Sequence, residues 1–418
     1  MKQALIIASG IGIIGEELNL YPQLNVSEVL QLKRLLINSE RAGINRFTIF
    51  CDESSKLSLL KISNDMRIQS QIEFVCENDG FKFEDGFAYV LQSNLLTYYT
   101  TIKAFIESSE KESGNTILSD NEDNTYGLLR LKKTDINKIR KTGDLTQILG
   151  GKSKSPIKNL PISDGYMMNL SSTKESLDEA KDLIFSNVGK TATGWIAINI
   201  NGRISLPLSR QLVKTSLTPN MVSVLINVIG VLSGPFYALG HPVIAALCMQ
   251  IATILDRCDG EVARVKLMET KRGQWVDTIS DQVSMLSFYI GLPIGYYILA
   301  QSNWIIVVGI INVLFFIFFI AWSFYFLLKY TDSGSLVAYM DVDNFIDEKK
   351  TTPVRKFISF LRPLGRRNVY SLAFLVLAIV GGTKYVFIFA SIGITFFFLH
   401  VLEDIIKLSK IKKREIYN

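Results

Sequence analysis

DRCDGEVAR at residues 256–264 and GQWVDTISD at residues 273–281 decide the fold of the second half of this chain. Asp256 and Asp259 are three positions apart, and Asp277 and Asp281 are four apart, so on two helices each pair would share one face. Carboxylates without His or Cys favour hard cations such as Mg²⁺ or Mn²⁺, and Mg²⁺ often adds phosphate oxygens as ligands. The pattern predicts two facing helices that bind divalent metal and a diphosphate.

Solvated loop charges are the alternative interpretation of these aspartates. The segment, however, lies between strongly apolar stretches, where an unpaired carboxylate is costly and usually functional. Gly260, Ala263 and Gly273 also lack side chains that would keep a ligand away from the helices. We therefore favour a binding site.

The spacing of these residues resembles, position for position, the signature of the CDP-alcohol phosphotransferase (CDP-alcohol phosphatidyltransferase) family of integral membrane enzymes. The resemblance implies that Asp256, Asp259 and Asp277 hold two Mg²⁺ or Mn²⁺ ions on the diphosphate of a CDP-alcohol. Asp281 would be the general base, and it completes the metal-binding set.

The same resemblance implies a surface that binds the CDP-alcohol donor. Leu217-Thr-Pro-Asn220 begins the first membrane span, with Pro219 in the first turn, as is common in the family. Arg264 would contact phosphate. The implied donor-binding residues are Gly260, Ala263, Arg264, Gly273, Thr218 and Asn220.

Composition predicts a membrane protein with a soluble portion. Hydrophobic residues make up 48% of the 418 positions, but the first half is mixed and polar while the second holds long apolar runs. We expect a domain at 1–190, a linker with an amphipathic helix at 191–216, and an all-α six-helix transmembrane domain at 217–410. The expected spans are 218–239, 242–256, 276–300, 303–328, 368–383 and 384–406.

Basic residues predict the orientation of these spans. Lys and Arg are frequent in 257–274, in 329–368 and in the tail, whereas the turns near Gly240, Ser302 and Gly382 contain only Lys384. Positive residues mark the cytoplasmic side, so both termini and the aspartates would face the cytoplasm. The net charge of +6 then reflects topology and lipid headgroups, with no sign of nucleic-acid binding.

The segment 203–214 alternates apolar and basic residues on a helical period, which suits a helix at the membrane interface. An ordinary linker helix is the alternative. Arg362, Arg366 and Arg367, just before the fifth span, are candidates for binding a phosphate on the acceptor. A positive-inside anchor explains these arginines equally well.

The first domain alternates strands near 3–9, 46–50, 71–75, 87–92 and 115–118 with helices near 27–42, 96–109 and 173–186. This order predicts a mostly parallel, Rossmann-like α/β sheet. Gly10, Gly12 and Gly15 form a GxGxxG pattern, but Pro22 interrupts the helix that a dinucleotide-binding motif needs. We therefore disfavour NAD binding.

The first domain instead resembles sugar-phosphate nucleotidyltransferases, through Ala8-Ser-Gly10-Ile-Gly12 and Ala42-Gly43-Ile44. That family expects an arginine where Ile14 stands, a lysine where Gln23 stands, and a metal-binding Gly-Asp in the region of Gln92-Ser-Asn94. Without these charges, nucleotidyl transfer lacks its electrostatic stabilisation. The resemblance thus implies a nucleotidyltransferase-like domain that is inactive.

In layout the chain resembles fusions of an inositol-phosphate cytidylyltransferase with a di-inositol-phosphate-phosphate synthase. We expect a transferase that moves a substituted phosphate from a CDP-alcohol to an alcohol or alcohol-phosphate acceptor, in a membrane and as a homodimer. A bifunctional enzyme that makes and uses CDP-inositol is the alternative. An ion transporter is disfavoured, because the aspartates lie at the ends of spans.

Overall fold

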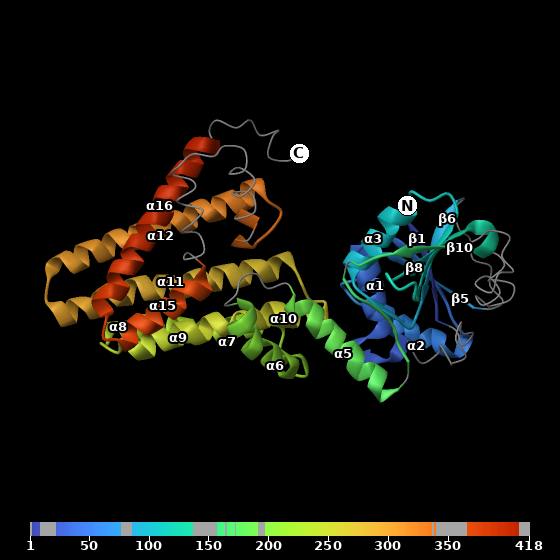
Figure 1. Ribbon diagram of the computed structural model, residues 1–418, viewed down its shortest axis with the longest axis horizontal. Coiled ribbons are helices and arrows are strands. Elements are labelled where there is room, and N and C mark those ends of the chain that lie inside the picture. The colour runs from blue at the N-terminus through green and yellow to red at the C-terminus, as the bar shows by residue number, and fades with distance from the viewer. Residues whose placement is uncertain are drawn as a thin grey trace. The chain divides into compact units, whose positions relative to one another are not determined.

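The computed structural model describes residues 2–8, 22–76, 86–136, 157–163, 165–171, 173–190, 197–336, 338–339 and 366–408 (Figure 1). It divides into two compact units. The first contains Met1–Lys190 with Val265–Leu267, and the second contains Thr191–Arg264 with Met268–Asn418. The glycine-rich segment 10–15, including Ile14, lies outside the described residues, as do Arg362 and the end of the C-terminal tail.

The first unit is an α/β domain built on a seven-stranded mixed sheet. Its strand order is β10 (Ile157–Pro161), β8 (Asn115–Ser119), β9 (Thr125–Lys132), β6 (Phe87–Gln92), β1 (Gln3–Ile7), β4 (Arg46–Phe50) and β5 (Gln71–Val75). The neighbours are parallel except that β9 is antiparallel to both β6 and β8. The helices of this unit are α1 (Gln31–Arg41), α2 (Glu53–Ser63), α3 (Tyr99–Ser109) and α5 (Lys174–Gly189).

The central strand β1 shows why this sequence forms a covered sheet. All five of its residues are buried, because helices pack against the sheet and leave no polar face to solvent. Ala4 and Ile6 belong to one hydrophobic cluster with Leu32 and Leu36 of α1 and Phe105 of α3. After Gln3, the residues of β1 are continuously apolar, with no polar alternation, as a strand buried on both faces requires.

The five predicted strands are present close to their expected limits, but two predicted helices begin late. Asn25–Val26 (β2) and Val29–Leu30 (β3) pair as a tight hairpin, in which Ser27 and Glu28 adopt positive φ angles of 52° and 62°. The helix predicted from residue 27 therefore begins at Gln31. The helix predicted from residue 96 begins at Tyr99, because Leu95–Thr97 (β7) pairs with Met167–Asn169 (β11). Sequence analysis also missed α2, β9 and β10.

The second unit is helical. Its helices are α6 (Gly202–Val213), α7 (Pro219–Val231), α8 (Ser233–Ala238), α9 (Pro242–Leu255), α10 (Arg257–Lys266), α11 (Lys271–Ala300), α12 (Asn303–Tyr330), α15 (Arg367–Ile379) and α16 (Thr383–Leu408). Four segments are long and apolar enough to cross a membrane: 219–238, 271–300, 303–330 and 383–403. Helices occupy the other two predicted spans as well, but α9 has 14 residues and α15 has 13, which is short for a bilayer.

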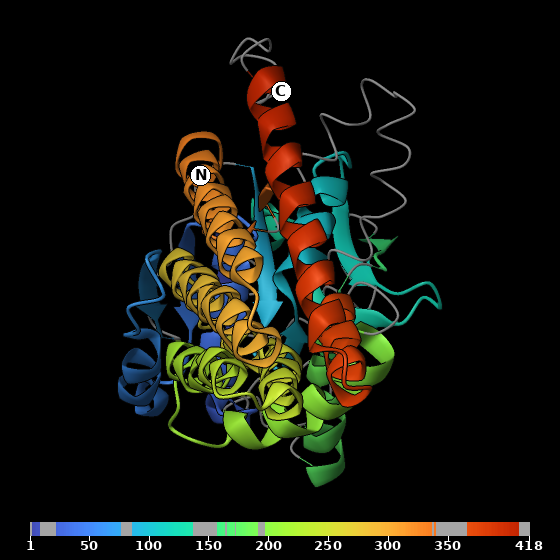
Figure 2. The same cartoon turned by 90° about the vertical axis from the view of Figure 1, so that its left-hand side faces the viewer.

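Glycines bring α8 and α11 into close contact. A Cβ atom added to Gly291 would lie 2.0 Å from the carbonyl oxygen of Gly234, and one added to Gly295 would lie 1.9 Å from that of Tyr237. Small residues at helix crossings are typical of membrane proteins, where close van der Waals packing replaces the hydrophobic effect between helices. Elsewhere α12 packs beside α16, where Asn312 Nδ2 donates a 2.7 Å hydrogen bond to Ser391 Oγ (Figure 2).

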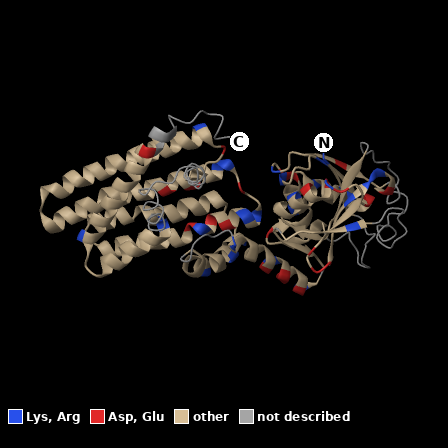
Figure 3. Cartoon of the chain, turned by 45° about the horizontal axis from the view of Figure 1, so that its top comes forward, with Lys and Arg blue, Asp and Glu red and all other residues tan. Residues whose placement is uncertain are grey.

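Charged residues are scarce along the long helices (Figure 3). The windows that qualify as spans contain at most two charged residues each, and their surfaces expose large apolar side chains such as Ile310, Leu314 and Ile392. Exposed apolar surface over several long helices indicates an integral, multi-pass membrane protein.

Candidate metal and phosphate site

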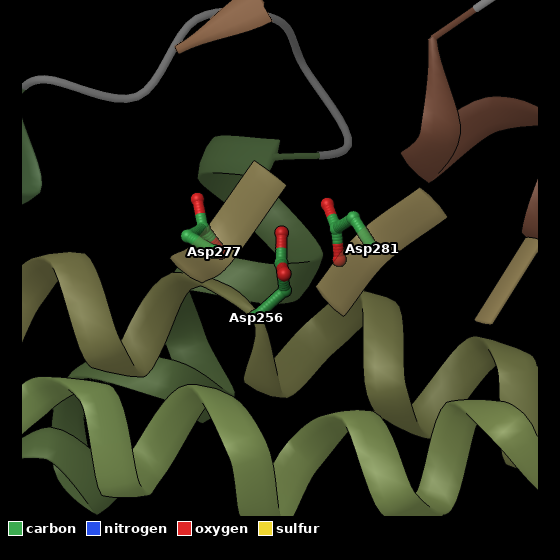
Figure 4. Close-up of side chains that lie close together, drawn as sticks. All are labelled: Asp256, Asp277 and Asp281. Atoms are coloured by element: carbon green, nitrogen blue, oxygen red, sulfur yellow. The ribbon is translucent and has the colours of Figure 1, made fainter. Parts of the chain in front are cut away.

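The aspartates are positioned by α9, α10 and α11. Asp256 caps the carboxyl end of α9, and Asp277 and Asp281 lie one turn apart on α11. Thr270 fixes the start of α11, because its hydroxyl accepts a 3.0 Å hydrogen bond from the backbone N–H of Gly273. Asp256, Asp277 and Asp281 each present a carboxylate oxygen, and these three atoms lie within 4.8 Å of one another (Figure 4).

Asp259 is held slightly apart from these three. Its carboxylate accepts hydrogen bonds from the Ser223 hydroxyl of α7 and from the Gly260 backbone N–H, the latter at 2.5 Å. It is buried, and it interacts electrostatically with Asp277. The structure thus brings all four predicted metal-binding residues into one region, with Asp259 oriented by protein donors.

Arg367, the first residue of α15, forms ion pairs with two of the aspartates. Its Nη1 atom lies 3.3 Å from Asp256 Oδ1 and also contacts Asp281. The guanidinium is largely buried. Sequence analysis placed Arg367 near an acceptor phosphate; its observed partners are carboxylates in the centre of the site.

Several buried polar atoms of the predicted site residues have no hydrogen-bond partner within the described part of the chain, among them Asp277 Oδ1, Arg264 Nε and Arg367 Nε. A buried carboxylate oxygen without a donor suits a cation, and buried guanidinium N–H groups without an acceptor suit an anion. Carboxylate ligands favour Mg²⁺ or Mn²⁺, and Arg favours phosphate. The residues present therefore fit a metal ion together with a phosphate group.

The small residues lie close to predicted ligand-binding side chains. A Cβ atom on Gly260 would lie 3.4 Å from Arg264 Nη1, and one on Gly273 would lie 3.2 Å from Asn220 Oδ1. Thr218 is the N-cap of α7, where its hydroxyl accepts a hydrogen bond from the Met221 N–H. This contact assigns Thr218 a capping role in the structure.

The remaining predicted residues are less informative. Ala263 is half-buried on α10. Arg366 is the exposed N-cap of α15, beside the buried Arg367. Arg362 lies outside the described residues.

Sequence analysis missed a buried polar cluster around Glu261. The Glu261 side chain is fully buried and accepts hydrogen bonds from Ser205 Oγ at 2.8 Å and Ser209 Oγ at 2.7 Å, both on α6. Arg257, one turn earlier on α10, pairs with it at 3.2 Å. The signal was present in the sequence, since Ser205 and Ser209 are four positions apart and mark the polar face of α6. This face attaches α6 to the helix that carries Asp259.

In the first unit, the residues that replace the nucleotidyltransferase charges are neutral and mostly buried. Gln92 ends β6, Ser93 and Asn94 follow it, and all three are at most 8% exposed. Asn94 Nδ2 donates to the Leu170 carbonyl at 3.5 Å. Gln23 is exposed and donates to Ser58 Oγ at 3.2 Å. These contacts stabilise the local fold and supply no carboxylate for a metal ion.

The comparison with solved structures finds similarity at low TM-scores. HddC from Yersinia pseudotuberculosis matches over 44% of this chain and 99% of its own, with 17% identity and a TM-score of 0.34.

Sequence comparison with curated proteins finds two informative relatives. The Bifunctional IPC transferase and DIPP synthase of Aquifex aeolicus is 33% identical over 125 residues, 30% of this chain and 29% of the relative. The protein of the same name from Thermococcus kodakarensis is 29% identical over 177 residues, 40% of each chain. The chain thus spans less than half the length of these relatives.

The family model for CDP-alcohol phosphatidyltransferase matches residues 216–338. This match contains Asp256, Asp259, Asp277 and Asp281 together with the α7 segment that approaches Gly273. Residues 216–338, which hold the four aspartates, are therefore the part of the chain that matches an enzyme domain of the CDP-alcohol phosphatidyltransferase family.

Proposed function

We propose that the four aspartates catalyse transfer of a substituted phosphate from a CDP-alcohol to an acceptor hydroxyl, with release of CMP. The observation that supports this most directly is the convergence of Asp256, Asp277 and Asp281 within 4.8 Å, beside buried Arg N–H groups that lack acceptors in the described residues. Carboxylates and guanidinium groups together match a metal-bound diphosphate.

In this proposal Asp256, Asp259 and Asp277 would hold two Mg²⁺ or Mn²⁺ ions, and Asp281 would contribute a further ligand atom. Bound metal would stabilise the negative charge that develops on the departing CMP. Asp281 accepts the proton of the acceptor hydroxyl as its oxygen forms a bond to phosphorus and the bond to CMP breaks. Arg264 binds a phosphate oxygen of the donor, and Thr218, Asn220 and the three small residues shape the donor-binding surface.

In the form of this proposal that we prefer, the acceptor is an alcohol phosphate. Arg367 forms ion pairs with Asp256 and Asp281, and its buried Nε–H group lacks an acceptor among the described residues. A guanidinium so placed can hold a phosphate near the proposed base. Inositol phosphate and glycerol phosphate fit this chemistry. A neutral alcohol remains the alternative.

CMP release by the purified full-length protein tests this function. CDP-diacylglycerol, CDP-archaeol and CDP-inositol should each be offered with Mg²⁺ against inositol phosphate, glycerol phosphate and neutral alcohols. We expect metal-dependent CMP release with at least one donor and a preference for a phosphorylated acceptor. Failure of every pair to release CMP would contradict the proposal.

A second candidate function adds synthesis of the donor. The names of both relatives pair two activities, which favours a bifunctional chain over an inactive first domain. The neutral residues at Gln92, Ser93 and Asn94 argue the other way, because nucleotidyl transfer requires a metal-binding carboxylate there in the family that the domain resembles. Pyrophosphate release from CTP would support the bifunctional chain, and its absence would support the inactive first domain.

We also propose that both termini and the aspartates face the cytoplasm, as the distribution of Lys and Arg indicates. A single cysteine introduced near the C-terminus, in a chain whose four native cysteines are replaced, should label only after cells are permeabilised. Labelling of intact cells by a membrane-impermeant reagent would show the opposite orientation and contradict this proposal. The homodimer remains an expectation from the family resemblance.

A further inference from the structure

One face of α7 contacts both helices of the acidic motif. Asn220, Ser223 and Asn227 are three and four positions apart, so they lie along one side of the helix. Asn220 Oδ1 approaches the position of Gly273 on α11, and Ser223 donates to Asp259 on α10. Asn227 Oδ1 accepts a 2.5 Å hydrogen bond from Ser284 Oγ on α11.

Hydrogen bonds connect these side chains into a continuous path. Ser284 donates to Asn227, Asn227 Nδ2 donates at 3.1 Å to the Ser223 carbonyl, and the Ser223 hydroxyl donates to Asp259. Ser223, Asn227, Ser284 and Asp259 are all at most 7% exposed. Because water does not compete at these positions, their geometry is fixed by protein groups alone.

Ser223 has two possible acceptors, the Asp259 carboxylate and the Pro219 carbonyl at 3.2 Å. One hydroxyl proton serves one of them at a time, and a bond to a charged acceptor is the stronger. With Ser223 bonded to one carboxylate oxygen and the Gly260 N–H to the other, Asp259 has a fixed orientation.

We propose that Ser223 is a positioning residue that orients Asp259 for metal binding, supported by Asn227 and Ser284. This inference rests on the proposed role of Asp259 as a metal ligand. Hydrogen bonds that orient metal-binding side chains commonly change metal affinity by about ten- to a hundredfold when removed. The α7 face thus belongs to the site although it contributes no carboxylate.

The test measures Mn²⁺ binding to detergent-purified full-length protein through the electron paramagnetic resonance signal of free Mn²⁺. Ser223→Ala should raise the Mn²⁺ dissociation constant by about tenfold, and Ser223→Thr, which restores a hydroxyl, should recover most of that loss. Ser287→Ala is the matched control, because Ser287 of α11 donates to the Val231 carbonyl of α7 at 2.7 Å, between the two helices that Ser284 and Asn227 also join, without touching an aspartate. It should bind Mn²⁺ as wild type does.

Asp259→Asn separates failure of this inference from failure of the proposed function. If Asp259→Asn loses Mn²⁺ binding while Ser223→Ala stays within twofold of wild type, the positioning role is wrong and the metal site stands. If Asp259→Asn binds Mn²⁺ normally, the proposed metal site itself is wrong. An equal loss in Ser223→Ala and Ser287→Ala would show a general packing effect and would also overturn the positioning role.

Discussion

The acidic site of the helical unit and the end of strand β6 in the first unit are both polar and buried, but they differ in charge. The first gathers the carboxylates of Asp256, Asp277 and Asp281 with Arg367, and Asp259 is buried beside them, while the second presents Gln92, Ser93 and Asn94. A buried neutral group costs about 1–3 kcal/mol when unpaired, whereas each buried ion costs several kcal/mol unless it is paired. Charge that is retained at this cost indicates a charged ligand. The residues at the end of β6 are neutral, although Ser93 Oγ and Asn94 Oδ1 also lack hydrogen-bond partners among the described residues.

The largest expected effect is at the centre of the charged site. Asp256→Asn keeps the shape of the side chain but removes a negative charge beside Asp277 and Asp281, so CMP release should fall below detection. Asp332→Asn is the control, because Asp332 is fully exposed and forms its ion pair with Lys271, away from the other aspartates. CMP release near the wild-type rate in Asp256→Asn would remove the basis for the site.

The two regions also differ from their surroundings in how well the sequence predicts them. The spacing of Asp256, Asp259, Asp277 and Asp281 was informative because helical periodicity converts spacing directly into a shared face. Ser223 was missed because its partner Asp259 lies on another helix, and a tertiary contact of that kind leaves no periodic signal. Glu261 was missed although Ser205 and Ser209 show the periodic spacing of its partners on α6. Ser27 and Glu28 concealed the β2–β3 hairpin, since neither residue type favours a positive φ angle.

Asp281→Asn should produce the second-largest effect and should separate chemistry from binding. Because a general base acts in the transition state, its removal should lower kcat by about 10²–10⁴-fold while the CDP-alcohol still binds. Single-turnover CMP release and donor binding should be measured on the same preparation. A parallel loss of donor affinity would assign Asp281 to binding and leave the base unidentified.

A smaller effect is expected at Arg367. Arg367→Lys keeps the positive charge near Asp256 and Asp281 but loses the planar guanidinium group with its two parallel N–H donors. The KM for a phosphorylated acceptor should therefore rise by about tenfold, which corresponds to the loss of one hydrogen-bonded contact with phosphate. Arg366→Lys, at the exposed neighbouring position, should change little. If the KM for acceptor is unchanged while the Mn²⁺ affinity changes, Arg367 acts on the carboxylates and does not bind the acceptor.

The smallest expected signal is pyrophosphate release by the first unit. Its residues predict that no pyrophosphate is released at all. Full-length Asp256→Asn, which cannot consume a CDP-alcohol, isolates this activity when it is given CTP, Mg²⁺ and inositol phosphate or glycerol phosphate. Pyrophosphate should stay at background, because Gln23 and the Gln92–Asn94 segment supply neither the cation nor the metal carboxylate that stabilise a leaving pyrophosphate. Release above background would instead establish the bifunctional enzyme that the relatives favour, and would show that charges elsewhere in the domain replace the missing ones.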